Sequence, residues 1–146
     1  MEDKFRCDCP FTSAIDVLGD KWILVIIKLM LLDGKDSFKS LSESDEAIAT
    51  NILSSKLKLL EAWGLISKTK LPDNKKANLY LLTEMGLSLT PILVELASWS
   101  DTQLRPIHPD LQDGEGLNMI RTDKEAFIKM VETNYRKKLA KLSLAL

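Results

Sequence analysis

The chain has 146 residues, enough for one domain with a continuous apolar core and a modest appendage, but short for two independent domains. Apolar residues make up 45% of it and charged residues 28%, which is typical of a soluble globular protein. The longest apolar run, residues 22–27, ends at Lys28 and is far shorter than the roughly 20 residues that span a bilayer. Because the N-terminal residues also lack an export signal, we expect a cytoplasmic protein with no membrane partner.

The net charge of −1 hides an uneven distribution of charge along the chain. Residues 51–80 contain six lysines against Glu61 and Asp73, whereas residues 83–117 contain six acids against Arg105. Such a separation of charge is expected of a protein that turns one face toward phosphate.

Three helices are predicted in the first 45 residues. Phe11, Ile15 and Leu18 recur at helical spacing, and Gly19 is expected to end that helix in a left-handed conformation. Asp20 can then cap a buried helix over residues 21–32. Ser37 can cap a short third helix, after which residues 42–46 form a polar turn.

A fourth helix and a hairpin follow. Leu53, Leu57 and Leu60 form one stripe and Gly64 marks its end, so a helix is predicted over residues 50–63. Residues 65–71 and 77–82 are strand-like and are separated by turn-forming residues, which indicates a β-hairpin with a basic tip. A further helix begins near Thr83 and presents apolar residues up to Trp99, with Pro91 kinking or restarting it.

The last 40 residues are expected to form an appendage. Prolines, glycines and acids over residues 106–121 predict a linker, so residues 1–105 would form the main domain. Thr122 and Glu125 have capping-box spacing, which predicts a C-terminal helix over residues 122–146. Its apolar stripe needs a partner, and we predict a dimer interface there, the alternative being packing onto its own domain; the stripe consists of Ile128, Val131, Tyr135, Leu139 and Leu142.

The order of these elements indicates a mainly α protein with a small β-hairpin (α+β), arranged as a winged helix-turn-helix with an additional C-terminal helix for dimerisation. In that arrangement the fourth helix enters the major groove of double-stranded DNA and the hairpin, or wing, lies against the backbone. The predicted contacts of this recognition helix are Thr50, Asn51, Ser54, Ser55, Lys56 and Lys58, and those of the wing are Asn74, Lys75 and Lys76. For a single amphipathic helix the alternative is a solvated face.

Several blocks of sequence occur in a fixed order: Cys9 and Pro10, then residues 17–22, 37–38, 48–53, 56–61, 64–66, 80–86 and 91–99. Together these blocks resemble the HxlR-type family of bacterial winged-helix transcription regulators. The resemblance implies a homodimer that binds a roughly palindromic operator, with the first and the C-terminal helices at the dimer interface. Lys56 and Lys68 stand where arginine is expected in many members, and the tail after Pro106 is longer than the family module.

The two cysteines, Cys7 and Cys9, exclude a structural disulfide framework. In some members of the family a cysteine at the position of Cys9 senses oxidants or electrophiles, which makes it a candidate sensor; the alternative is an inert thiol. Cys7 could resolve it, although a disulfide across one residue is strained. With His108 these residues fit no zinc pattern, so no metal or other cofactor is expected.

Two other functions compete with a DNA-binding regulator gated by a thiol or by a small ligand. A winged-helix module that binds proteins without DNA would fit the near-neutral total charge. A thiol enzyme that uses Cys9 lacks a general base, so no enzymatic activity is expected. Trp22, Trp63 and Trp99 lie in or at the end of apolar helices and are predicted to be core residues.

Overall fold

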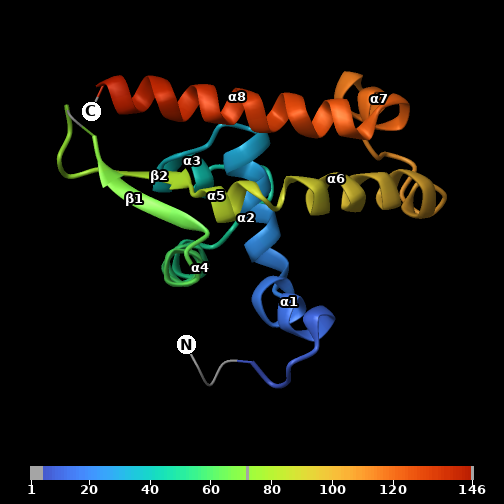
Figure 1. Cartoon of the computed structure of the whole chain (residues 1–146), viewed down its shortest axis with the longest axis horizontal. Coiled ribbons are helices and arrows are strands. Elements are labelled where there is room, and N and C mark those ends of the chain that lie inside the picture. Colours follow the sequence, from blue (N-terminus) through green and yellow to red (C-terminus); the bar gives the residue numbers. More distant parts are fainter. Residues whose placement is uncertain (1–4, 72, 146) are drawn as a thin grey trace. The chain divides into compact units, whose positions relative to one another are not determined.

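The computed structural model describes residues 5–71 and 73–145 of the chain. It confirms a mainly α-helical protein with one two-stranded antiparallel sheet (Figure 1). The chain divides into two compact units, the first ending at Gly86 and the second beginning at Leu87. Among the described residues, none of the helices combines the length and the apolar character that crossing a bilayer requires.

The first unit begins with helices α1 (Pro10–Leu18) and α2 (Lys21–Leu32), as predicted. The carboxylate of Asp20 caps α2 by accepting a hydrogen bond from the Trp22 N–H at 2.7 Å. The prediction of a left-handed Gly19 was wrong, because its φ is −71°. A Cβ atom at this position would lie 2.5 Å from the carbonyl oxygen of Ile15, so close backbone approach explains the glycine.

Helices α3 (Phe38–Ser42) and α4 (Thr50–Ala62) complete the helical part of this unit. The Ser37 hydroxyl caps α3, as predicted, and accepts from the Ser40 N–H at 3.0 Å. The leucine stripe of α4 is buried, and Gly64 follows the helix with a φ of +78°, a left-handed conformation that favours glycine. Helix α4 packs against α2 and α3.

Strands β1 (Ile66–Lys70) and β2 (Asn78–Leu82) form the predicted hairpin, with Ile66 opposite Leu82 and Lys70 opposite Asn78. The base of the hairpin is held to the helices, because β1 contacts α4 and β2 contacts α2. The Tyr80 N–H also donates to the carbonyl of Asp36 at 2.8 Å. The short helix α5 (Glu84–Leu87) then leads out of the first unit.

The Thr83 hydroxyl joins the end of α4 to the start of α5. It donates to the carbonyl of Gly64 at 2.6 Å and accepts from the Gly86 N–H at 3.1 Å. Gly86 has no room for a side chain, since a Cβ atom would lie 2.1 Å from the carbonyl oxygen of Leu65. The path of the chain after the hairpin is therefore fixed by one side chain and one close backbone contact.

The second unit consists of α6 (Thr90–Trp99), the π-helical turn η2 (Ser100–Leu104), α7 (Glu115–Thr122) and α8 (Lys124–Ala145). Pro91 lies in the first turn of α6, so it marks a restart rather than a kink. Within this unit α8 contacts both α6 and α7 (Figure 1). The cap of α8 is Asp123, which accepts from the Ala126 N–H at 3.1 Å, and not the predicted Thr122.

Helix α7 lies in the range that was expected to be a linker, so the linker prediction was wrong for residues 115–121. The division after Gly86 also differs from the expected domain boundary at residue 105. Gly116 and Asn118 give α7 a weak helical signal in the sequence. Its stability comes from packing against α8, which buries Ile120 and Phe127.

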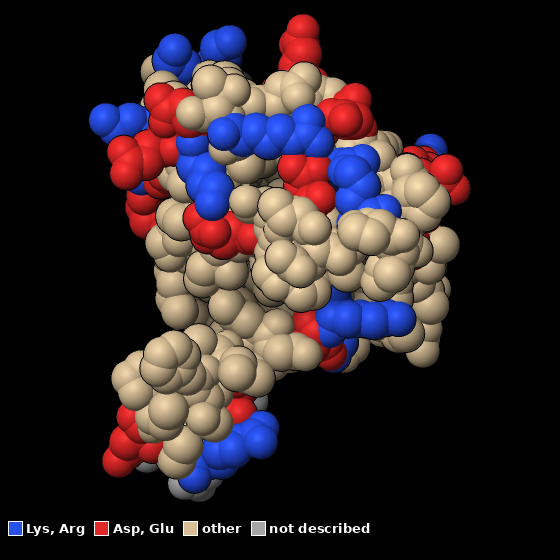
Figure 2. Space-filling view, turned by 90° about the vertical axis from the view of Figure 1, so that its right-hand side faces the viewer, with Lys and Arg blue, Asp and Glu red and all other residues tan. Residues whose placement is uncertain are grey.

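A network of charged groups joins η2 to α7. The Arg121 guanidinium donates to both carboxylate oxygens of Asp101 at 2.7 Å and to Asp113 at 2.9 Å. Arg105 donates to Asp101 at 3.0 Å and to the carbonyl of Leu111 at 3.1 Å. Figure 2 shows acidic and basic side chains interspersed on the face that it displays, most densely in its upper part.

Candidate nucleic-acid interface

Helix α4 presents a polar face on the side opposite its leucine stripe. Thr50, Asn51, Ser55 and Lys58 are exposed, and Ser54 is half-buried. Leu53, Leu57 and Leu60 anchor the helix in the core of the first unit, so its orientation is set by apolar packing. The exposed side chains offer amide, hydroxyl and ammonium groups, which are the groups that bind base edges and phosphates.

Lys56 differs from its neighbours on α4. Its ammonium forms an ion pair with the Oδ2 atom of Asp20, and its side chain is only 23% exposed. Partial burial is the largest single influence on Asp20 and opposes its ionisation. The hydrogen bond and charge of Lys56 together with the backbone N–H groups of Trp22 and Ile23 outweigh it and hold the pKa of this carboxyl below its usual value. In this structure Lys56 ties α4 to the start of α2, and its contact with DNA stays a prediction.

At the tip of the hairpin, Lys75 and Lys76 are exposed. Asn74, predicted as a third contact, has a structural role in the turn, because its side-chain oxygen accepts from the Lys76 N–H at 3.1 Å. Its carbonyl also accepts from the Ala77 N–H at 3.1 Å. The exposed Lys70 on β1 was not singled out from the sequence, and it extends the cationic surface of the wing.

The turn between α3 and α4 carries the opposite charge. Glu43 and Asp45 are exposed there, and Glu46 pairs with Lys28 of α2 at 2.8 Å. Ala47 has a φ of +54°, a left-handed conformation that is uncommon for residues other than glycine. The acidic residues of this turn are visible in the sequence. The pairing of Glu46 with Lys28 could not be predicted from local sequence, because the two residues are 18 positions apart.

Cys9 is the residue that precedes the first turn of α1, and both Cys9 and Cys7 are exposed free thiols. Hydrogen bonds from the backbone and the side chain of Thr12, followed by one from the Phe11 backbone, lower the pKa of the Cys9 thiol. The described residues contain no group of three or more metal-ligating side chains that could hold a metal ion.

The apolar stripe of α8, predicted as a dimer interface, is largely covered within the single chain. Val131 and Tyr135 are buried, and Ile128, Leu139 and Leu142 are half-buried. Because α8 packs on α6 and α7 of its own unit, the stripe does not require a second copy of the chain. These contacts are those of the alternative considered for this helix, and the dimer interface on it stays a prediction.

Other apolar side chains are exposed instead. On α1, Phe11 is 82% exposed and Ile15 is 62% exposed. On α6, Ile92, Leu96 and Trp99 are exposed, and the exposed fraction of Trp99 reaches 56%, so the prediction that Trp99 is a core residue was wrong. Helical spacing identifies an apolar face but does not say whether the same chain covers it.

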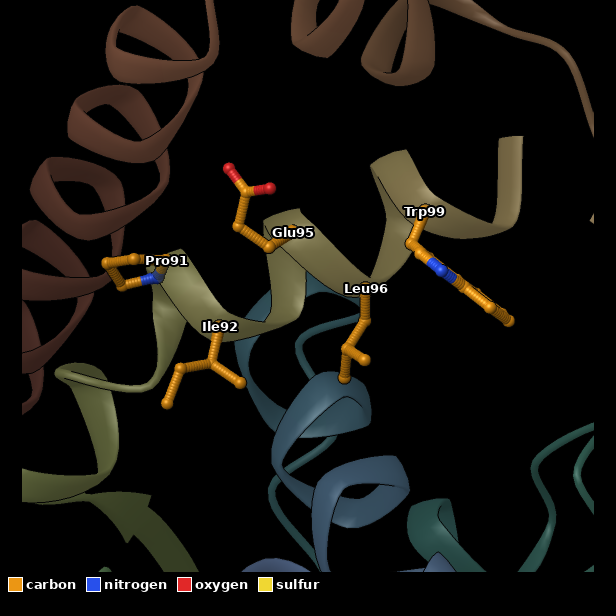
Figure 3. Close-up of a pocket in the computed structure, with 5 residues that line it drawn as sticks. All are labelled: Pro91, Ile92, Glu95, Leu96 and Trp99. Carbon is orange, nitrogen blue, oxygen red and sulfur yellow. The ribbon is translucent and has the colours of Figure 1, made fainter. Parts of the chain in front are cut away.

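The exposed face of α6 forms a shallow groove of about 470 Å³, lined by Pro91, Ile92, Glu95, Leu96 and Trp99. Figure 3 shows Ile92, Leu96 and Trp99 projecting from one side of the helix, with Glu95 pointing to the other side. The carboxylate of Glu95 pairs with Lys124 of α8 at 3.1 Å. The side of α6 that carries Ile92, Leu96 and Trp99 is therefore an exposed apolar surface, while Glu95 is paired within the second unit.

The chain is similar to known helix-turn-helix proteins. The family of HxlR-like helix-turn-helix proteins matches residues 17–108. The HTH-type transcriptional regulator BH0655 of Halalkalibacterium halodurans is 39% identical over 92 residues, covering 63% of this chain and 81% of that protein. The HTH-type transcriptional regulator YodB of Bacillus subtilis is 33% identical over 99 residues, covering 67% of this chain and 88% of YodB.

Two solved structures show the same fold as the matched part of the chain. The reduced form of YodB is 32% identical with a TM-score of 0.56, covering 68% of this chain and 98% of YodB. The reduced form of the redox regulator HypR is 26% identical with a TM-score of 0.58, covering 69% of this chain and 99% of HypR. The predicted winged helix-turn-helix is confirmed, and the chain belongs to the HxlR-like helix-turn-helix family of transcriptional regulators.

Proposed function

We propose that this protein regulates transcription by binding a specific sequence of double-stranded DNA as a homodimer. The observation that carries the proposal is the polar face of α4, which exposes Asn51, Ser55 and Lys58 opposite a buried leucine stripe. The lysine-tipped hairpin follows α4 in the same unit. This is the order in which a winged helix-turn-helix presents its recognition helix and its wing.

Each part of the surface has a distinct task in this proposal. Asn51 can form two hydrogen bonds with adenine in the major groove, while Ser55 and Thr50 bond to bases or phosphates. Lys58 at the helix and Lys75 and Lys76 at the wing neutralise phosphates. Sequence discrimination therefore comes from α4, and affinity for any duplex comes mainly from the lysines.

The exposed apolar faces support a homodimer. Phe11 and Ile15 on α1, and Ile92, Leu96 and Trp99 on α6, present large apolar side chains to water in the single chain. A second copy would cover them, and a two-fold symmetric pair would place two recognition helices on a roughly palindromic operator, about 34 Å apart. This proposal moves the interface from the stripe of α8 to α1 and α6.

Thiol chemistry at Cys9 is the proposed signal. The thiol is exposed at the start of α1 and has a lowered pKa, so a larger fraction of it is thiolate at neutral pH than in a free cysteine. Among the similar structures are HypR, described as a redox regulator, and quinone-bound and diamide-treated forms of YodB. Because α1 carries the apolar face assigned to the dimer, oxidation or alkylation of Cys9 would act on the spacing of the two recognition helices.

The test begins with selection of bound duplexes from random DNA, followed by fluorescence anisotropy on the selected operator and on a scrambled duplex. Asn51→Ala is expected to weaken operator binding by roughly 10-fold to 100-fold and to leave binding of the scrambled duplex unchanged. Lys129→Ala, on the exposed side of α8, is the matched control and should change neither. A wild-type protein with no salt-dependent affinity for duplex DNA would favour the protein-interaction module instead.

The thiol proposal is tested separately on the same operator duplex. A quinone or diamide is expected to reduce operator binding by the wild type and by Cys7→Ser, whereas Cys9→Ser stays bound. Loss of binding by all three proteins alike would show that the reagent acts elsewhere.

A further inference from the structure

Lys28 is a charged residue within an otherwise apolar helix. In α2 its neighbours Ile27 and Leu29 are buried, yet the Lys28 side chain is 37% exposed and reaches two carboxylates. Its Nζ atom lies 2.8 Å from Oε1 of Glu46 and 3.1 Å from Oδ2 of Asp33. One ammonium therefore links the middle of α2, the end of α2 and the turn before the recognition helix.

The turn that Lys28 holds leads directly into α4. Ile48 is buried, and Ala47 has a left-handed backbone conformation in which its N–H donates to the carbonyl of Ser44 at 3.0 Å. Such a conformation in a residue other than glycine costs free energy and persists only where the surroundings impose it. The side chain of Glu46, adjacent to Ala47, is 29% exposed and is the point at which the turn is tied to α2.

The electrostatics of this turn oppose DNA binding unless they are compensated. Glu43, Asp45 and Glu46 lie within eight residues of Asn51, in the turn that precedes the proposed recognition helix. A carboxylate near phosphate repels it, and the repulsion is strongest where water is excluded. The ammonium of Lys28, on α2, compensates the charge of Glu46 within the protein.

We propose that Lys28 is a positioning residue for DNA recognition: by binding Glu46 it fixes the turn that precedes α4 and keeps this carboxylate away from the phosphates. The inference rests on the proposed function and assigns to Lys28 no contact with DNA. Its ammonium is shared by two acids, so its charge is already compensated in the protein.

The ionisation of the two partners is consistent with this role. Burial lowers the pKa of Lys28, but hydrogen bonds to Glu46 and then to Asp33 outweigh it, so the pKa lies above its usual value. The hydrogen bond from Lys28 is the largest influence on Glu46 and holds the pKa of that carboxyl below its usual value. Both groups are therefore charged at neutral pH, where DNA would be bound.

The experiment uses the full chain and four proteins: wild type, Lys28→Met, Glu46→Gln and the double variant. Anisotropy measures the Kd for the selected operator duplex between low and moderate salt, at a temperature where circular dichroism shows each protein folded. We expect Lys28→Met to weaken operator binding about tenfold, because an uncompensated carboxylate is left in the turn. Adding Glu46→Gln should restore most of the affinity together with the wild-type dependence of log Kd on log salt, because the repelling carboxylate is removed.

Each alternative gives a different result. If Lys28 binds a phosphate, Lys28→Met lowers the salt slope by about one and Glu46→Gln does not rescue it, which overturns the inference. If the pair serves stability alone, folded Lys28→Met binds with the wild-type Kd although it unfolds at a lower temperature, which also overturns it. Should Lys28→Met not fold, the exchanged pair of Lys28→Glu with Glu46→Lys provides the same test. A wild type that does not bind duplex DNA would refute the proposed function itself.

Discussion

The two compact units use their charged side chains in different ways. In the first unit, Lys58 on α4 and Lys75 and Lys76 on the hairpin are exposed. In the second unit, Arg121 and Lys124 form ion pairs with carboxylates of the same unit. The second unit also exposes apolar side chains on α6, as the first unit does on α1. The net charge of −1 therefore conceals an exposed cationic surface in the first unit, whose sign favours contact with a polyanion. The exposed apolar surface on α6 favours contact with another protein instead.

The largest loss of operator affinity is expected from a charge placed on the apolar side of α6. Leu96→Glu is expected to prevent dimerisation, because a carboxylate would be buried in the interface. Since two linked recognition helices bind far more tightly than one, operator affinity should fall by roughly 100-fold or more. Analytical ultracentrifugation and anisotropy check this together. A variant that stays dimeric would remove α6 from the proposed interface, and Ser88→Glu, at an exposed position before α6, is the control.

Removing the lysines of the wing should have the next largest effect. Lys75→Ala combined with Lys76→Ala is expected to weaken binding of operator and scrambled duplex alike, on the order of tenfold, and to reduce the salt slope by about two. Titrations at several salt concentrations measure both quantities. Loss of operator binding alone would mean that the wing reads sequence, contrary to its assigned task.

The two lysines of α4 provide a sharper test within the first unit. Lys58→Ala should reduce the salt slope by about one and leave the unfolding temperature unchanged, because its side chain is exposed. Lys56→Ala should leave the slope unchanged and lower the unfolding temperature, because it removes the ion pair with Asp20. Equal effects of the two substitutions on the slope would show that Lys56 also reaches the DNA.

The smallest effect is expected from the network of the second unit. Hydrogen bonds from Arg121 and Arg105 hold the pKa of Asp101 well below its ordinary value of 3.8. A depressed folded-state pKa contributes stability above the unfolded-state value, and this stability is lost as the pH falls below about 4. Thermal unfolding between pH 7 and pH 3 should therefore show a smaller acid loss for Arg121→Ala than for the wild type. Operator affinity at neutral pH should stay the same.

Local signals in the sequence identified much of the fold. The Asp20 and Ser37 caps, the leucine stripe of α4 and the turn residues of the hairpin all predicted their elements, because each depends on neighbours within a few residues. Helix α7 was missed because packing against α8, rather than helix propensity, stabilises it.

The candidate site was predicted less completely than the fold. The exposed face of α4 follows from its periodicity, but the pairing of Lys56 with Asp20 joins residues 36 positions apart. The exposure of Trp99 and the burial of Val131 depend on which apolar face the chain covers by itself. Periodicity contains no information on that choice, so it could not say which of the apolar faces, on α8 or on α1 and α6, is open to a second copy of the chain.

The Thr83 hydroxyl gives the first unit a mechanical property. The Thr83 hydroxyl donates its one proton to the carbonyl of Gly64, and its oxygen accepts from the Gly86 N–H. One hydroxyl group therefore binds both the residue that follows α4 and a residue of α5. A side chain of only three heavy atoms therefore connects the end of α4 to the start of α5. This short connection couples the orientations of these two helices within the first unit.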